Sequence, residues 1–146
     1  MLSILLPVYN CNCVALVTEL QRQCTECGTD FEIIVADDCS SVASYIEHNL
    51  RIERLDGVRY ITRKHNVGRS AIRNFLISQA QGEWLLFIDG DLTLDNPYFI
   101  RRYLQTKSNV VVGGIRIGGD PDRWKNNLRY RYEKAYEQKN TPQDRQ

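Results

Sequence analysis

Residues 84–91, WLLFIDGD, are the stretch of this sequence that decides its fold. Five apolar residues run without interruption and are followed at once by two carboxylates on either side of Gly90. An unbroken apolar run of this kind is typical of a strand covered on both faces, as in a parallel sheet. The stretch therefore predicts a strand over residues 84–88 that ends in a pair of acidic side chains.

Strand and helix patterns alternate on both sides of this strand. Further strands are predicted at residues 3–8, 32–36, 58–62 and 110–115. Helices are predicted at residues 14–22, 43–49, 69–80 and 97–105, and a basic helix at residues 128–139. The expected buried stripe of the helix over 69–80 is Ala71, Phe75, Leu76, Ile77 and Ala80. This order predicts an α/β fold with an open, doubly wound, mostly parallel sheet flanked by helices.

Polar residues follow each of the first four predicted strands. The segments are 7–10 (PVYN), 37–41 (DDCSS), 63–68 (RKHNVG) and 89–91 (DGD). Ligands of such sheets bind beyond the carboxyl ends of the strands. The four segments are therefore predicted to form one binding site.

Asp89 and Asp91 predict a site for a divalent cation. Two carboxylates roughly 5 Å apart repel each other by about 3 kcal/mol at an effective dielectric constant of about 20. A hard cation that prefers carboxylate oxygens removes this penalty. Gly90 is expected to permit a tight turn and the close approach of a ligand. The alternative is an acidic turn that caps the next helix.

Asp37 and Asp38 form a second acidic pair. Ser40 and Ser41 are expected to cap the helix over 43–49, which leaves one carboxylate free. A free carboxylate here can accept a hydrogen bond from a uracil imide or a ribose hydroxyl. The alternative is simple compensation of the helix dipole.

The third polar segment continues as a basic cluster. Its members are Arg63, Lys64, His65, Asn66, Gly68, Arg69, Arg73 and Asn74. Arg69 and Arg73 are four residues apart, so they share one face of the predicted helix. A helix N-terminus itself favours anions. The cluster therefore predicts a diphosphate site, with a solvated helix start as the alternative.

Composition narrows the class of protein. The net charge of +1 gives no overall field toward nucleic acid or a membrane surface. The apolar runs are far shorter than the ~20 residues of a spanning helix, and residues 2–8 lack the pattern of a leader peptide. Neither the G-x-G-x-x-G nor the G-x-x-x-x-G-K-[ST] pattern occurs, which argues against a dinucleotide cofactor and against a P-loop enzyme. Tyrosines interleaved with basic residues in the predicted helix over 128–139 could stack on RNA bases. Packing of this helix against another element is the simpler interpretation, so no nucleic-acid partner is predicted.

The five cysteines do not indicate a disulfide framework. Their number is odd, and no secretory leader accompanies them. Free thiols are the simpler interpretation. A zinc site formed by Cys11, Cys13, Cys24 and Cys27 is the alternative.

With these segments assembled, the sequence resembles family 2 glycosyltransferases of the GT-A fold. The resemblance is carried by residues 3–10 (SILLPVYN), 33–40 (IIVADDCS), 66–74 (NVGRSAIRN) and 82–91 (GEWLLFIDGD). It covers residues 1–115 well and the remainder loosely.

The resemblance implies a role for each matching residue. Pro7 and Tyr9 would line a nucleoside pocket, and Asp38 would bind the base, with uracil expected. Arg73 would reach the diphosphate, beside Asn66 and Gly68 in the same donor site. Asp89 would contact the ribose or sugar side of the donor and, with Asp91, would bind Mn²⁺ or Mg²⁺. The implied activity is inverting transfer of a sugar from a UDP-linked donor to a saccharide or lipid-linked acceptor. The implied location is the cytoplasm, at the inner face of the membrane.

The sequence also departs from the pattern of inverting members. No Glu-Asp pair follows Asp91, and no Gln-x-x-Arg-Trp occurs. We therefore expect a donor-binding domain at residues 1–115 and a linker with a basic helix at 116–146 that leads to an absent acceptor half. The general base is expected beyond Gln146, and the apolar side of the basic helix predicts self-association.

The sequence is also compatible with two other functions. The first is a nucleotide-sugar-binding fragment without catalysis. The second is a phosphatase of the haloacid dehalogenase type, with Asp89 as nucleophile and Asp91 as general acid.

Overall fold

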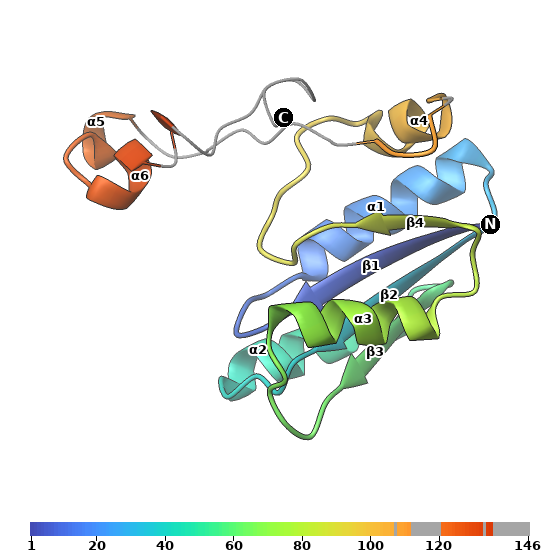
Figure 1. The fold of residues 1–146 in the computed structure, drawn as a ribbon, viewed down its shortest axis with the longest axis horizontal. Coiled ribbons are helices and arrows are strands. Elements are labelled where there is room, and N and C mark those ends of the chain that lie inside the picture. Colours follow the sequence, from blue (N-terminus) through green and yellow to red (C-terminus); the bar gives the residue numbers. More distant parts are fainter. Residues whose placement is uncertain (107, 112–120, 133, 136–146) are drawn as a thin grey trace. The chain divides into compact units, whose positions relative to one another are not determined.

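The computed structural model describes residues 1–106, 108–111, 121–132 and 134–135. Its four strands form one parallel sheet in the order β3-β2-β1-β4 (Figure 1). The strands are β1 (Leu2–Val8), β2 (Phe31–Asp37), β3 (Val58–Thr62) and β4 (Trp84–Phe87). Each lies within one residue of its predicted bounds. The sheet confirms the predicted doubly wound α/β class.

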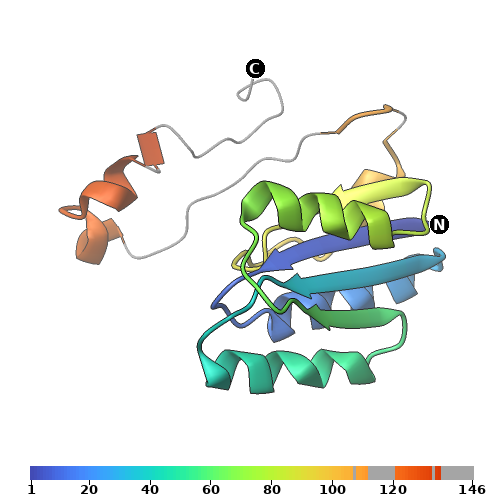
Figure 2. The ribbon, with the colours of Figure 1, turned by 60° about the horizontal axis from the view of Figure 1, so that its bottom comes forward.

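Helices cover both faces of this sheet. They are α1 (Val14–Cys27), α2 (Ala43–Asn49), the 3-10 helix η1 (Leu50–Arg54), α3 (Arg69–Gln79) and α4 (Phe99–Leu104). Figure 2 shows α3 on one face and α1 and α2 on the other. The chain divides into two compact units, Met1–Leu104 and Gln105–Gln146. The second unit contains α5 (Pro121–Trp124) and α6 (Leu128–Tyr132).

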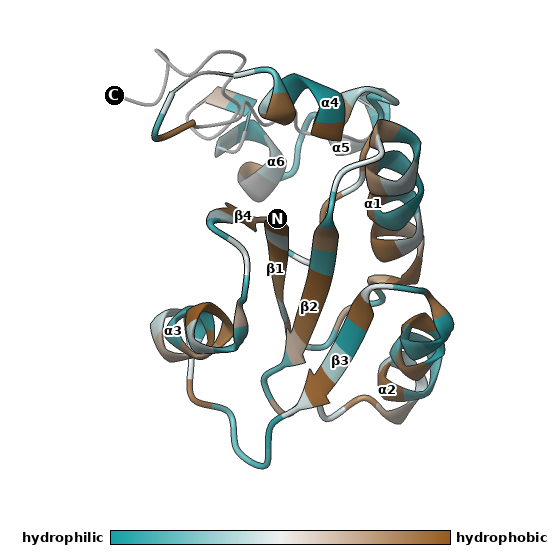
Figure 3. Cartoon of the chain, turned by 90° about the vertical axis from the view of Figure 1, so that its right-hand side faces the viewer, coloured by the Kyte–Doolittle hydropathy of each residue, from teal (hydrophilic) through white to brown (hydrophobic). Residues whose placement is uncertain are grey.

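The central strands β1 and β2 are buried on both faces, as their apolar runs predict. Ile4, Leu6 and Val8 belong to the core under α1, whereas Leu5 belongs to the core under α3. The apolar strands lie between the helical layers in Figure 3. Burial on both faces is what places the polar segments only at the strand ends.

Strand β4 does not follow this rule. Its Trp84, Leu85 and Phe87 are 55%, 42% and 37% exposed. The expectation of burial on both faces is therefore wrong for β4 within the described residues. The reason is that α3 packs over β1 and β2 rather than being centred on β4.

The helices α1 and α3 differ from their predicted form, and α4 is shorter than the predicted 97–105. α1 continues past residue 22 to Cys27, because Arg22 pairs with Glu19 and Glu26 along the helix and Gly28 then ends it. In α3 the buried residues are Ile72 and Leu76, which pack on Leu5, Ile34 and Ala36. Ala71 and Ile77 are exposed, so their place in the predicted stripe is wrong. The contact of α3 with the sheet is thus made by Ile72 and Leu76, which are four residues apart on one face of the helix.

Some expectations lie wholly or partly outside the described residues. Val110 and Val111 are not in a strand, and residues 112–115 of that expected strand are not described. The boundary expected at residue 115 falls in the same gap. The helix expected at 128–139 is seen as α6 over its first five residues, and residues 133 and 136–139 are not described. Among the described residues, no helix is long and apolar enough to cross a membrane.

Candidate functional site

The topological switch point of the sheet lies between β1 and β4. The chain runs outward from β1 to β2 and β3, then crosses through α3 to the other side of β1. The pairing of β1 with β4 ends at Leu5 and Phe87, with a last hydrogen bond of 3.1 Å from the Ile88 N–H to the Leu5 carbonyl. Pro7 has no N–H with which to continue that pairing. The two strands separate there, and ligands of open α/β sheets bind at such a point.

Asn10 holds the loop after β1 against the start of α2. Its side-chain oxygen accepts hydrogen bonds from the N–H groups of Ser41 (2.8 Å) and Val42 (3.2 Å). Its own N–H donates to Ser40 Oγ at 2.8 Å. Val42 is the N-cap residue and has no side-chain cap of its own, so capping by Ser40 or Ser41 is wrong. Asn10 adopts a φ of 49°, a conformation that asparagine tolerates better than most residues. It thereby positions the neighbouring Tyr9, which is 52% exposed.

Asp37 is fully buried at the end of β2 and has a structural role. Its Oδ1 accepts the Ser40 N–H at 2.7 Å, and its Oδ2 accepts the Tyr60 hydroxyl proton. Burial, and then the hydrogen bond with Asp37, raise the pKa of Tyr60. Beside them, buried Asn49 donates to the Cys11 carbonyl at 2.9 Å and accepts from the Cys13 N–H at 3.0 Å. The bond between Tyr60 and Asp37 joins β3 to β2, and the bonds of Asn49 join α2 to the loop after β1.

The raised pKa of Tyr60 predicts that its contribution to stability depends on pH. The fold favours the protonated phenol, so this contribution is fully present below the ordinary pKa of about 10. It is lost progressively as pH rises above that value. The difference in unfolding free energy between the unmodified chain and Tyr60→Phe, measured in urea, should therefore shrink in alkaline buffer. A difference that stays constant from neutral to alkaline pH would contradict this expectation.

Asp38 holds the loop after β3. Its two carboxylate oxygens accept the N–H groups of Val67 and Gly68, each at 2.9 Å. Gly68 has a φ of 84°, which L side chains rarely adopt, and Asn66 Oδ1 also accepts its N–H at 3.2 Å. Asp38 therefore already holds a loop, and its expected role in binding a base stays a prediction. Each carboxylate oxygen of Asp38 still has a second lone pair.

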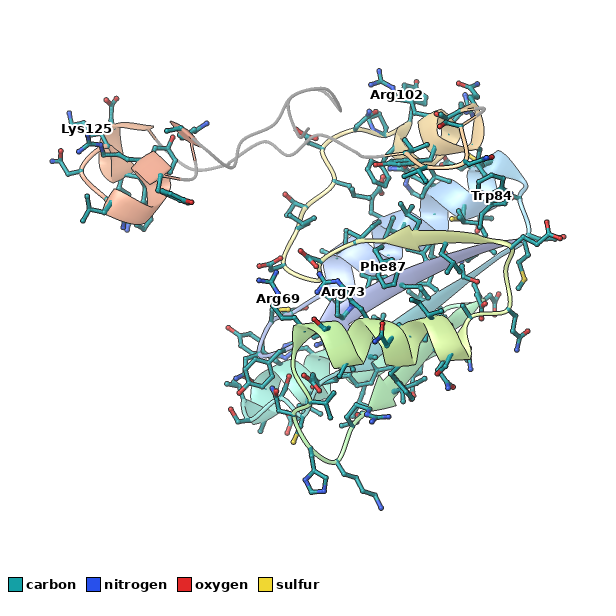
Figure 4. All side chains as sticks on the ribbon, in the orientation of Figure 1. Arg69, Arg73, Trp84, Phe87, Arg102 and Lys125 are labelled. Atoms are coloured by element: carbon teal, nitrogen blue, oxygen red, sulfur yellow. The ribbon has the colours of Figure 1, made fainter. Side chains whose placement is uncertain are left out.

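Asp89 faces two arginines of α3. Arg73 Nη2 donates to Asp89 Oδ1, and Arg69 Nη2 lies 3.9 Å from Asp89 Oδ2. Figure 4 shows both arginines extending from the start of α3 toward the loop that follows β4. Asp91 is exposed, and within the part of the chain that the structure describes it makes no hydrogen bond or ion pair. The structure thus brings the predicted acidic and basic groups together.

Gly90 is required by packing rather than by its backbone conformation. It is buried, and its φ lies outside the positive range. A Cβ added there would lie 2.7 Å from Val8 Cγ2 and 3.2 Å from the Pro7 carbonyl oxygen. The expected turn is present, with the Leu92 N–H donating to the Asp89 carbonyl at 3.2 Å, but it does not need a positive φ at Gly90. The small residue lets the loop of Asp89 and Asp91 rest on the end of β1.

We expect Gly90→Ala to displace that loop. The new methyl group would contact a main-chain atom of β1, so the loop must move and overpacking should cost about 1–3 kcal/mol. Urea denaturation measures this loss of stability, and titration with UDP, the ligand expected from the sequence, tests whether ligand affinity falls with it.

The matched control is Gly28→Ala at the end of α1. No atom lies within 4 Å of the Cβ added there, but Gly28 has a φ of 62°. Backbone strain should therefore cost about 1 kcal/mol of stability without moving the loop after β4. Equal weakening of UDP binding by both variants would contradict the packing role of Gly90.

Asp89 and Asp91 suit a hard divalent cation only if a bound ligand supplies the rest of the cation's coordination sphere. Asp89 and Asp91 offer carboxylate oxygens, which Mg²⁺ and Mn²⁺ prefer. Among the described residues, no three His, Cys, Asp or Glu side chains lie together in a group that could hold a metal ion. Mg²⁺ characteristically completes such a sphere with substrate phosphates and water. The residues therefore fit a cation bound together with a diphosphate.

The remaining members of the basic cluster have other surroundings. The Arg63 guanidinium lies 4.1 Å from the centre of the Phe75 ring, while Lys64 and His65 are exposed. All five cysteines are free, and burial raises the pKa of the Cys13 and Cys24 thiols to about 12.

Two residues that support the site, Tyr60 and Asn49, were not predicted, and a third, Asn10, was predicted only as part of segment 7–10. No local pattern marks Tyr60 or Asn49, because their partners lie in distant segments of the chain. Asn10 carried one weak signal, since asparagine tolerates a positive φ. Polar residues that support a loop through tertiary contacts are thus hard to recognise from sequence.

A parallel α/β sheet with carboxylates and arginines at its switch point is the arrangement of a domain that binds an anionic ligand beyond its strand ends. The sequence profile of Glycosyl transferase family 2 matches residues 3–146. The chain therefore belongs to glycosyl transferase family 2. Membership of this family rules out the interpretation as a phosphatase of the haloacid dehalogenase type. In addition, the Asp89 carboxylate accepts a hydrogen bond from Arg73, whereas a nucleophile would need a free carboxylate oxygen.

Two relatives illustrate the similarity in sequence. A glycosyltransferase of Haemophilus influenzae with no characterized activity is 34% identical over 93 residues, which are 62% of this chain and 29% of that protein. The poly(ribitol-phosphate) beta-glucosyltransferase of Bacillus spizizenii is 33% identical over 126 residues, which are 79% of this chain and 19% of that protein. The chain thus spans less than a third of the length of either relative.

Solved structures agree with the fold. Staphylococcus aureus TarS 1-349 in complex with UDP-GlcNAc superposes with a TM-score of 0.58 at 26% identity, over 70% of this chain and 30% of that one. The mannosyltransferase PcManGT of Pyrobaculum calidifontis, in complex with GDP-Man and Mn²⁺, gives a TM-score of 0.55 at 17% identity. That match covers 86% of this chain and 37% of the other, and it shows the fold alone.

Proposed function

We propose that this chain is the donor-binding part of a metal-dependent, inverting glycosyltransferase that uses a UDP-linked sugar. The observation that carries the proposal is the meeting of Arg69 and Arg73 with the Asp89 loop at the switch point. Cationic side chains suit a diphosphate, and adjacent carboxylates suit the cation that accompanies it. TarS, whose structure was solved with UDP-GlcNAc, supports a uridine donor.

The nucleoside end of the donor is assigned to residues of the first two strand ends. Pro7 and Tyr9 line this pocket, and the exposed ring of Tyr9 is available to stack on the base. Asp38 accepts the imide N–H of uracil with a lone pair that its bonds to Val67 and Gly68 leave unused. Asn66 and Gly68 shape the loop beneath the nucleoside.

The phosphate end is assigned to α3 and the loop after β4. Arg73 donates to the diphosphate, and Asp89 contacts the ribose or sugar side and shares the cation with Asp91. When bound, a divalent cation stabilises the charge that develops on the leaving nucleoside diphosphate. The proposed acceptor is a saccharide or a lipid-linked saccharide, and no residue of this chain is assigned as its general base. In the proposed division, residues 1–115 bind the donor and residues 116–146 connect to an acceptor-binding part.

Titration calorimetry with UDP in the presence and absence of Mn²⁺ tests donor binding. Donor hydrolysis and transfer to an acceptor are measured in parallel. Cation-dependent binding of UDP supports the proposal, and binding without turnover favours the alternative of a non-catalytic binding fragment. The absence of UDP binding in both conditions would refute the donor site.

We also propose a location in the cytoplasm, at the inner face of the membrane. Five free cysteines, two of them buried, suit a reducing compartment. Leu128 and Tyr132 of α6 are 80% and 56% exposed, which supports an apolar surface for self-association or for another part of the assembly. Sedimentation velocity over a range of protein concentrations measures the self-association.

A further inference from the structure

Two arginines of α3 converge on the Asp89 carboxylate. Arg73 contacts Asp89 Oδ1, and Arg69 approaches Asp89 Oδ2, so each guanidinium faces a different oxygen. A second nitrogen of Arg73, Nη1, donates to the Arg69 carbonyl at 3.3 Å. The two cations are therefore held side by side by one anion.

The arrangement of these ion pairs favours exchange of Asp89 for another anion and contributes little to the stability of the fold. One carboxylate leaves the group of Arg69, Arg73 and Asp89 with a net positive charge. The side chains of Arg69 and Asp89 are 86% and 45% exposed, and pairs this open to water contribute little to folding. A diphosphate offers more negative charge and more acceptor oxygens than a carboxylate, and it suits the paired donors of arginine.

We infer that Asp89 occupies the place of an anionic ligand on Arg69 and Arg73, and that Arg69 is a second cation for the donor's diphosphate. Binding then exchanges partners: the phosphate oxygens take the two guanidiniums, and the Asp89 carboxylate is released. The identity of the anion as the donor's diphosphate rests on the proposed function. The competition itself depends only on these three side chains.

The inference predicts that removing the Asp89 charge strengthens the binding of an anion when no metal is present. Inorganic pyrophosphate is titrated by calorimetry in buffer with a chelator, so that neither base recognition nor a cation contributes. Asp89→Asn should bind pyrophosphate roughly fivefold more tightly than the unmodified chain, because exposed ion pairs compete at about this level. Arg69→Gln and Arg73→Gln should each weaken that binding severalfold.

The matched control is Glu26→Gln. Glu26 pairs with Arg22 on α1, and its substitution changes the net charge equally. It should leave pyrophosphate affinity unchanged, and circular dichroism verifies that every variant is folded. Unchanged or weaker pyrophosphate binding by Asp89→Asn would overturn the competition, as would equal strengthening by Glu26→Gln. An effect of Arg73→Gln without one of Arg69→Gln would overturn the role of Arg69.

The outcome is distinguishable from a failure of the proposed function. Loss of UDP binding with Mn²⁺ in the unmodified chain would refute the donor site but not the competition measured with pyrophosphate. Undetectable pyrophosphate binding in every variant would refute the present inference but leave cation-dependent UDP binding intact.

Discussion

Asp91→Ala should lower the affinity for UDP in the presence of Mn²⁺ on the order of 100-fold, or about 2.7 kcal/mol. Asp91 is the exposed carboxylate of the loop after β4, and among the described residues no hydrogen bond or ion pair engages it. Asp89, by contrast, is already shared with Arg69 and Arg73. Loss of Asp91 therefore removes the carboxylate that is most available to a cation.

Calorimetric titration with UDP, with and without Mn²⁺, checks this expectation. Binding without Mn²⁺ should be the same as in the unmodified chain or slightly stronger, since a negative charge near the diphosphate is gone. Asp56→Ala, which removes an exposed carboxylate from the turn before β3, is the control and should change neither value. Mn²⁺-dependent affinity that survives in Asp91→Ala would refute the metal assignment.

Asp37→Ala should lower the free energy of unfolding by about 3 kcal/mol. The substitution leaves two buried donors, the Ser40 N–H and the Tyr60 hydroxyl, without their acceptor. Each unsatisfied buried group costs roughly 1–3 kcal/mol. The loss should also loosen the turn that carries Asp38 and thereby weaken UDP binding.

Urea denaturation of the variant measures this loss, and two other variants calibrate it. Tyr60→Phe removes one of the two hydrogen bonds and should cost about 1 kcal/mol. Asp30→Ala, which removes an exposed carboxylate just before β2, should change stability by less than about 0.5 kcal/mol. A cost for Asp37→Ala as small as that for Asp30→Ala would show that Asp37 does not support the turn.

Local sequence determined the strands and the edge at which the site forms. The runs in β1 and β2 are largely apolar, as is typical of strands covered on both faces. Parallel strands bring all their carboxyl ends to one edge, so the polar segments after them must meet. For this reason the acidic and basic groups of the site could be predicted together.

Tertiary structure decided which role each acidic residue of the site has. Asp37 and Asp38 are adjacent and chemically identical, yet Asp37 supports Tyr60 and Ser40 while Asp38 holds the loop at Gly68. Successive side chains at a strand end point to opposite sides, and the partners on each side come from distant segments. The hydrogen bonds of Asn10 to the segment before α2 and the packing of Gly90 on β1 also depend on such contacts.

The carboxylates on either side of Gly90 show the same division most clearly. The sequence by itself placed Asp89 and Asp91 at the end of a strand and at a ligand edge, because chain order and hydrophobic pattern are local properties. Only the crossover through α3 decided that Asp89 faces two arginines while Asp91 faces solvent. The pairing of Asp89 with Arg69 and Arg73 depends on the direction in which α3 crosses the sheet. Packing between residues far apart in the chain sets this direction.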